Sequence, residues 1–319
     1  MDNLIFSLNA MLPLFLLMVT GMVLKRASLV DERTAGGMNK FVFSIGIPVL
    51  LFEDLATADL AKEWDGAFIL FCFAATAAGI CISFAFSLLY RKTSYQGEFV
   101  QAAYRSSASM LAIAIIQNIY GDPGIAPLMV IGAVPLYNVM AVVILTFMRP
   151  RSSAGHTLPA APVSISGALR DVARNPIIIG IVLGIAWAAL RIPMPGVLDK
   201  TLKEIAATVT PMGFIAMGVL FDGKKALAVR GPAVLATAIK LVGLVALTVP
   251  VAAALGMHGQ RLVAVLVMMG SATTLSSFVM ARSMGHEGTL SSSVVMLSTL
   301  LSAFTLTGWL WLFKTLGLI

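Results

Sequence analysis

The chain has 319 residues, of which 59% are hydrophobic and 12% are charged, and its formal net charge is +7 at pH 7. A soluble globular domain is about half apolar and about one quarter charged, so this chain has too few polar residues to cover a water-soluble core of its size. The composition excludes an ordinary soluble domain and predicts an all-α polytopic membrane protein. In such a protein a basic excess reports membrane topology, so we expect no nucleic-acid partner.

Ten apolar stretches along the chain are long enough to cross a membrane. A helix that crosses the hydrocarbon core needs about 17–25 mostly apolar residues. The predicted spans cover residues 4–24, 38–55, 67–90, 99–121, 126–148, 175–191, 204–221, 232–256, 261–283 and 289–313. We expect the first stretch to be a retained helix and not a signal peptide, because no basic residue precedes it.

The longest polar break, RPRSSAGHTLPAAPVSIS at 149–166, separates the first five spans from the last five. We therefore expect a first five-helix repeat at 1–148, a linker at 149–173 and a second five-helix repeat at 174–319. Most lysines and arginines of the predicted loops fall on the side of the membrane that holds this linker. The positive-inside rule predicts that this side is cytoplasmic and that both termini lie on the outer side. We expect the protein in the cell (inner) membrane.

The two halves carry matching residues at a fixed distance. A shift of 163 positions places Gly21 on Gly184 and Pro48 on Pro211. Each half holds an odd number of predicted spans, so the second half must enter the membrane from the opposite side. The result is a 5+5 inverted repeat, an architecture typical of secondary transporters.

Small hydroxyl residues lie at the centre of spans four and nine. With one further residue of shift, SASML at 107–111 falls on SATTL at 271–275. Two interrupted helices form the midplane substrate site of inverted-repeat transporters, and hydroxyl groups can satisfy the backbone that a break frees. We predict irregular, crossing helices near 107–109 and 271–274, although small residues also serve ordinary tight packing. The candidate substrate-binding residues here are Ser107, Ser109, Ser271, Thr273 and Thr274.

Two cations are predicted inside the membrane. Arg105 precedes SASML, and Lys240 lies in AIKLVGLVAL of span eight. A central cation costs about 2.5–3.5 kcal/mol on insertion scales, and spans three to five and eight to ten show no acidic residue at depth. An anionic substrate would supply the missing counter-charge, whereas snorkelling to the surface is the alternative. Asn138 of span five is a further candidate. Glu53 and Asp54 are expected in the solvated outer interface, and a proton relay is the alternative for them.

Several stretches together resemble the auxin efflux carrier family, which includes bacterial malonate and malate permeases. They are NKFVFSIGIPVLLF (39–52), VPLYNVMAVVIL (134–145), RNPIIIGIVLG (174–184), ATVTPMGFIAMGVLF (207–221), ATAIKLV (236–242) and FVMARSMGHEGTLSSSVVMLSTLLSAFTL (278–306). The resemblance implies ten helices and an elevator-like motion. Spans one, two, six and seven would form a dimerising scaffold, and spans three to five and eight to ten the moving domain.

The resemblance also implies that spans four and nine are the crossover helices. The family usually has a proline there, often beside asparagine, whereas this chain has Ser107-Ala108-Ser109 and Ser271-Ala272-Thr273. That departure argues against a plant-hormone-like substrate.

We interpret the chain as a secondary transporter of small organic anions, such as carboxylates, that works as a homodimer in the lipid bilayer. The first alternative is a sodium- or proton-coupled carrier of the antiporter or bile-acid symporter type. A passive channel or a receptor-like sensor is the second. An enzyme is disfavoured because a nucleophilic serine needs a nearby base, and no histidine lies in a predicted span. We expect no cofactor and no metal site.

Overall fold

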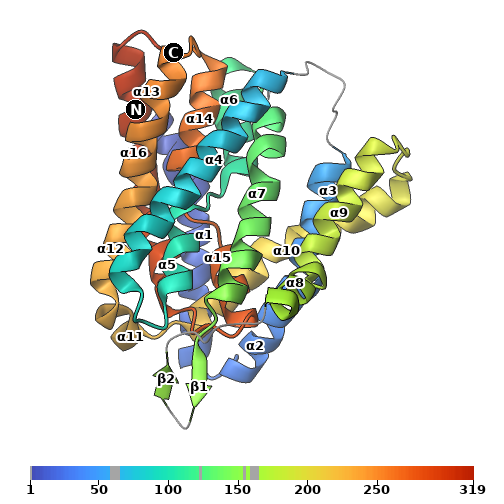
Figure 1. The fold of residues 1–319 in the computed structure, drawn as a ribbon, viewed down its shortest axis with the longest axis vertical. Helices are drawn as coiled ribbons and strands as arrows, with labels where there is room; N and C mark the ends of the chain where they lie inside the picture. The colour runs from blue at the N-terminus through green and yellow to red at the C-terminus, as the bar shows by residue number, and fades with distance from the viewer. Residues whose placement is uncertain (1, 58–64, 122–123, 154–155, 159–164) are drawn as a thin grey trace.

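The computed structural model describes residues 2–57, 65–121, 124–153, 156–158 and 165–319, and nearly all of them are helical (Figure 1). The first half contains α1 (Asp2–Arg26), α2 (Glu32–Phe41), the π-helix η1 (Val42–Gly46), α3 (Ile47–Ala56), α4 (Gly66–Ser87), the 3-10 helix η2 (Leu88–Tyr90), α5 (Gln96–Tyr104), α6 (Ala108–Tyr120) and α7 (Ala126–Phe147). A two-stranded antiparallel hairpin follows, β1 (Arg151–Ser153) and β2 (His156–Leu158), and adds a small strand element to the expected all-α fold.

The second half is again helical. It contains α8 (Ile165–Ala173), α9 (Pro176–Ala189), α10 (Gly196–Leu220), α11 (Gly223–Ala228), α12 (Arg230–Ala238), the π-helix η3 (Ile239–Gly243), α13 (Leu244–Ala254), α14 (Gln260–Gly270), α15 (Ser276–Ser283) and α16 (Thr289–Thr315). Each half contains one π-turn inside a longer helix, η1 in the first half and η3 in the second.

Six helical segments of the described residues are long and apolar enough to cross a membrane. They are Glu32–Ala56, Gly66–Tyr90, Ala126–Phe147, Gly196–Leu220, Arg230–Ala254 and Thr289–Thr315. A pair bent by 58°, Ser166–Ala173 with Pro176–Ala189, raises the number to seven. The chain is therefore a polytopic membrane protein. This count is below ten partly because predicted spans four and nine are each divided between two shorter helices.

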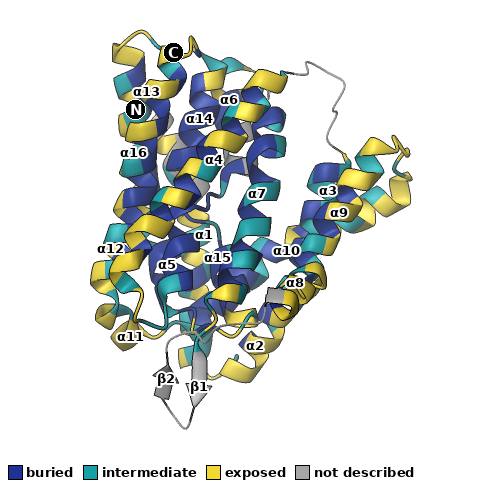
Figure 2. Ribbon diagram, in the orientation of Figure 1, coloured by how far each residue is buried: buried dark blue, intermediate teal, exposed yellow. Residues whose placement is uncertain are grey.

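The two termini lie toward one end of the helical bundle, and the β1–β2 hairpin lies at the other end (Figure 1). Between these ends the most deeply buried helices are short. Every residue of α5 from Gly97 to Tyr104 is buried, and so is every residue of α14 from Leu262 to Gly270 (Figure 2). By contrast, α9 exposes several large apolar side chains, which suits contact with lipid. The core of the molecule thus surrounds the half-helices and not the longest helices.

Glycine allows α1 and α10 to approach closely. A Cβ atom on Gly21 would lie 2.2 Å from the carbonyl oxygen of Ile215, and one on Gly218 would lie 2.0 Å from that of Met18. Real Cβ atoms do not approach backbone this closely, so only glycine fits at both positions. Small residues at such crossings are typical of packed membrane helices.

The second close pair, α3 with α9, repeats the same contact. A Cβ atom on Gly184 of α9 would lie 3.0 Å from the carbonyl oxygen of Phe52 in α3. Subtracting 163 from Gly184 and Ile215 gives positions 21 and 52, so the two glycine contacts correspond under the shift found in the sequence. In each of the two contacts, a glycine of one half packs against the backbone of a helix of the other half.

Candidate functional site

Two interrupted helices meet at the centre of the fold. Helix α5 ends at Tyr104 and α6 begins at Ala108, while α14 ends at Gly270 and α15 begins at Ser276. The backbone N–H of Ser107 donates to the carbonyl oxygen of Ala272 at 2.9 Å, so the two breaks touch. We call residues 105–107 and 271–275 together the crossover.

The break in the first half lies slightly earlier than expected. We predicted irregular backbone near 107–109, but Ser109 lies inside α6, and its side chain falls outside the described residues. The small residues Ser107 and Ala108 mark the start of the second half-helix and not the middle of the gap. In the second half the predicted 271–274 and the observed 271–275 agree within one residue.

Hydroxyl groups satisfy the carbonyl oxygens that the breaks release. The Thr273 hydroxyl donates to the carbonyl oxygen of Ala102 at 2.8 Å, which ties the second break to the last turn of α5. The hydroxyls of Ser106 and Tyr137 both donate to the carbonyl oxygen of Met268 in the last turn of α14. A helix end leaves up to four carbonyls without helical partners, so these bonds stabilise the interruption.

Arg105 is buried in the crossover and is held by neutral groups. Its relative exposure is 2%. Its guanidinium donates to the Asn138 amide oxygen at 2.7 Å, to the Ser276 hydroxyl at 2.8 Å and to the Met280 sulfur at 2.8 Å. Its Nε has no hydrogen-bond partner among the described residues. The structure therefore buries a cation without giving it an acidic contact in the described part of the chain.

A cavity of about 330 Å³ opens beside the crossover. Its lining falls into two chemically different sets. The crossover wall is mainly polar and consists of Arg105, Ser106, Ser107, Val134, Tyr137, Asn138, Ala272, Thr273, Thr274, Leu275, Ser276 and Thr299. The facing wall comes from α1, α3 and α10 and is mainly apolar: Met11, Leu14, Ile47, Leu50, Leu51, Asp54, Val209, Thr210 and Phe214.

Most of the predicted site residues lie in this cavity. Arg105, Ser107, Asn138, Thr273 and Thr274 all line the crossover wall. Ser271 does not line it: the residue is fully buried, and its hydroxyl has no hydrogen-bond partner among the described residues. The structure thus brings together five of the eight candidates.

Lys240 does not line the cavity either, although it was predicted to contact the substrate. It is fully buried in the π-helix η3, and its ammonium group donates to the carbonyl oxygen of Met269. Met269 is in the last turn of α14, where a cation complements the negative end of the helix dipole. Lys240 therefore stabilises the C-terminal end of α14 and does not contact the cavity.

Sequence reasoning missed six polar residues of the lining, namely Asp54, Ser106, Tyr137, Thr210, Ser276 and Thr299. Asp54 was expected in the solvated interface, yet it lies on the same face of α3 as Ile47, Leu50 and Leu51. The spacing 47, 50, 51 and 54 is that of one helix face, and this periodicity was the available signal.

The half-helices that begin at the crossover have uncapped N-termini. Neither Ser107, the N-cap of α6, nor Leu275, the N-cap of α15, makes a side-chain capping bond. Both residues line the cavity. Free N–H groups at a helix N-terminus carry partial positive charge, so these ends add to the field of Arg105.

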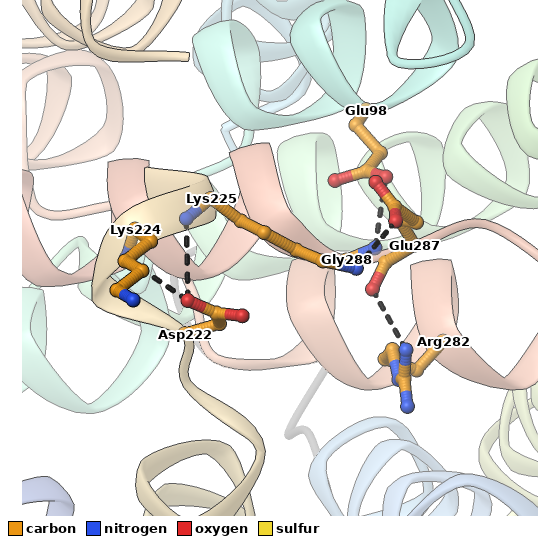
Figure 3. A network of polar contacts seen from close by, with 7 residues as sticks. All are labelled: Glu98, Asp222, Lys224, Lys225, Arg282, Glu287 and Gly288. Carbon is orange, nitrogen blue, oxygen red and sulfur yellow. Dashed lines mark hydrogen bonds and ion pairs between the residues drawn. The ribbon is translucent and has the colours of Figure 1, made fainter. Parts of the chain in front are cut away.

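A second polar network shares no residue with the cavity lining and includes Glu98 of α5, Lys225 of α11 and Glu287 (Figure 3). The buried carboxylate of Glu98 accepts the backbone N–H groups of Gly288 and Ser291 at 2.9 Å each, at the N-terminus of α16. Nearby, Lys225 of α11 pairs with Glu287 at 2.9 Å. Glu98 is buried although it lies just before the predicted span 99–121, and therefore outside the spans that we expected to hold no acid at depth. Backbone N–H groups, and not a cation, compensate its charge.

Comparison with known proteins decides the family. The profile of the family described as "Membrane transport protein" matches residues 6–310. The chain belongs to the auxin efflux carrier family of membrane transport proteins.

Two relatives illustrate the range of this transporter family. A Rhizobium meliloti (strain 1021) protein named "Putative malonate transporter" is 25% identical over 316 residues, which cover 95% of each chain. A rice (Oryza sativa subsp. japonica) protein named "Probable auxin efflux carrier component 5c" is 30% identical over 138 residues. That match covers 41% of this chain and 37% of the rice protein, so the chain spans well under half of that relative.

Proposed function

We propose that this transporter carries small organic anions, with carboxylates as the substrate class, and holds them at the crossover of α5–α6 with α14–α15. The observation that carries the proposal is Arg105. It is a buried cation that lines a cavity, and its hydrogen-bond partners are all neutral.

The physical reason is the cost of burying an uncompensated charge. Removing a guanidinium from water is unfavourable unless an anion and good hydrogen bonds replace the lost hydration. A carboxylate supplies both, because the planar guanidinium fork matches its two oxygens. The hydroxyls of Ser107 and Thr274 and the uncapped N-terminus of α6 add further donors in the same cavity. These groups orient one carboxylate, and the mainly apolar facing wall receives the rest of the substrate.

The mechanism that we propose is an elevator within a ten-span, 5+5 inverted repeat. Spans one, two, six and seven would form a scaffold, which dimerises, and spans three to five and eight to ten would move with the substrate. The matching contacts of Gly21 and Gly184 support the repeat, since both join an element of one half to an element of the other. The first repeat would cover 1–148, the linker 149–173 and the second repeat 174–319, in the inner membrane with both termini outside.

The name of the Rhizobium meliloti relative supports malonate as one member of the proposed substrate class. The lining residues favour the class and do not select one acid from it. A passive channel is the second reading of the same cavity. Saturable counterflow of a carboxylate in liposomes separates a carrier from a channel, because a channel shows none.

Ligand binding to purified variants tests the proposal. Ligands that bind the folded state raise its apparent stability, so a thermal-shift screen with carboxylates, amino acids and uncharged amides identifies the class. We expect carboxylates to bind the wild type. Arg105→Gln should lower their affinity at least about tenfold, or about 1.4 kcal/mol of binding free energy. Arg105→Lys is expected to retain part of the affinity, because it keeps the charge and loses the planar fork.

Arg170→Gln is the matched control, since Arg170 is an exposed arginine of α8. It should bind carboxylates like the wild type. Equal carboxylate affinity in Arg105→Gln and the wild type would refute the anion site, and so would uncharged amides that bind as tightly as the acids.

A further inference from the structure

The described lining of the cavity includes one acidic and one basic side chain. Among the described residues of the lining, Asp54 and Arg105 are the charged ones. Arg105 belongs to the crossover wall and Asp54 to α3 of the facing wall, whose other members are apolar apart from Thr210. An acid on an otherwise apolar wall is costly to bury, so its presence there calls for a function.

Asp54 differs from its neighbour Glu53. Glu53 does not line the cavity. Its Oε1 lies 3.9 Å from the Nζ of Lys203 in α10, and Lys203 also pairs with Asp199. Asp54 makes no hydrogen bond or ion pair with any described residue. The two adjacent carboxylates therefore divide into one that is paired with a cation and one that is directed to the cavity.

The surroundings of Asp54 contain few other groups that titrate. Helix α9, which packs against α3, has no acidic, basic or histidine residue. Helix α10 also packs there, and besides Lys203 and Asp199 it carries the exposed residues Lys200 and Glu204. Of the other described residues that line the cavity, Arg105 is the charged one. Among the residues that the structure describes, Asp54 is thus the unpaired titratable group at this wall.

An anion that enters this cavity changes the electrostatics of Asp54. Two carboxylates that share a site of low dielectric constant do not both stay ionised, and one of them takes up a proton. The substrate carboxylate gains the Arg105 guanidinium, so the proton goes to Asp54. We propose that Asp54 takes up a proton when an organic anion occupies the Arg105 site, so that anion and proton bind as a coupled pair. This inference rests on the proposed function and adds the coupling ion to it.

The step balances without any further reactant. One proton from water forms an O–H bond on the Asp54 carboxylate, no covalent bond to the substrate forms, and release of the anion returns the proton. By linkage, whatever favours proton binding favours anion binding to the same extent. Anion affinity should therefore rise as the pH falls.

Calorimetry on the full-length protein in detergent tests the coupling. The probes are malonate and 3-phenylpropionate above pH 7, where both are ionised, each titrated in two buffers with different ionisation enthalpies. We expect the wild type to take up about one proton per bound anion and to lose affinity with rising pH, approaching about tenfold per pH unit. Asp54→Asn should take up none, and its affinity should not vary with pH.

Glu53→Gln is the matched control: it removes the neighbouring carboxylate and should keep the proton uptake and the pH dependence of the wild type. Burial lowers the pKa of His286 to about 4, so this histidine stays neutral over the range tested. The pH dependence of the wild type alone also tests the inference, even if Asp54→Asn does not fold.

The outcomes separate this inference from the proposed function. If neither probe binds the wild type, or if Arg105→Gln binds like the wild type, the anion site itself is wrong and the inference falls with it. Arg105-dependent binding without proton uptake, or with uptake that Asp54→Asn retains, overturns the inference alone. Tight binding of phenylalanine that needs Asp54 and takes up no proton would also overturn it, because Asp54 would then hold an ammonium group. Sodium-dependent binding without proton uptake would do the same.

Discussion

Two buried cations occupy different positions relative to the crossover. Arg105 lines the cavity and donates to side chains, whereas Lys240 is enclosed and donates to the backbone of α14. The first can contact a ligand directly. The second can act only through the position of the broken helix and through its charge.

We expect Lys240→Gln to weaken carboxylate binding about tenfold, or about 1.4 kcal/mol. Without the ammonium group the carbonyl of Met269 loses its donor, and the end of α14 loses a complementary charge. Folding should survive, because removing a charge from the membrane relieves an insertion cost. Titration of the apparent melting temperature with carboxylate measures the effect.

Lys200→Gln, an exposed lysine of α10, provides the comparison and should leave carboxylate affinity unchanged. Lys240→Arg should bind more tightly than Lys240→Gln, since it keeps the charge. A Lys240→Gln protein with the affinity of the wild type would restrict this lysine to a packing role.

Sequence alone located the residues of the site along their helices but not the directions in which they point. Insertion cost identified Arg105 and Lys240 as unusual, and the matched serines identified the two breaks. Which cation faces the cavity depends on helix rotation, and Lys240 lies in a π-turn, which changes the rotation of the following residues. The position of Asp54 in the cavity lining was missed for a related reason, because the distance of a residue from the end of a span does not show which way its side chain points.

At the scale of the elements, close packing depends on glycine contacts that the apolar pattern does not reveal. The shift of 163 residues singled out Gly21 and Gly184, but Gly218 became notable only through its partner on α1. The sequence gives candidates for such contacts, whereas the pairing of helices comes from the fold.

Gly218→Ala should destabilise the protein by about 1–3 kcal/mol, the usual cost of overpacking. The new methyl group would meet the backbone of α1 at Met18, and backbone cannot move aside as a flexible side chain can. Thermal unfolding and size-exclusion profiles of the purified protein in detergent would report the loss.

Gly308→Ala in α16 is the control substitution, since a Cβ atom there has no heavy atom outside its own helix backbone within 4 Å. It should unfold at or slightly above the temperature of the wild type, because alanine is favoured over glycine inside a helix by about 0.5–1 kcal/mol. If Gly218→Ala and Gly308→Ala unfold alike, the approach of α1 and α10 is looser than described.

At the scale of the whole molecule, the proposed topology makes the two ends of the bundle accessible from opposite sides. The termini lie toward one end and the hairpin at the other (Figure 1). In the topology that we propose, the hairpin end faces the cytoplasm. A single cysteine in place of the exposed Leu316 should react with an impermeant thiol reagent in intact cells. A cysteine in place of the exposed Lys224 should react only after permeabilisation.

The experiment requires Cys81→Ser, because Cys81 is exposed while Cys72 is buried. Labelling of both positions after permeabilisation confirms that each cysteine can react. Ready labelling at position 224 in intact cells would reverse the orientation.

The unequal walls of the cavity have a consequence for the speed of any sliding motion. Directional bonds must be broken in turn as one surface passes another, whereas dispersion contacts exchange neighbour for neighbour with little change in energy. The side chains of the facing wall offer almost no hydrogen-bonding groups. In the proposed elevator, a crossover that carries substrate would therefore meet a low energy barrier as it moves along this wall. Asp54 is the charged exception on this wall. An ionised Asp54 would raise the energy barrier to the movement and a protonated Asp54 would lower it. The protonation of a single carboxyl group would then set the rate of the proposed transport cycle.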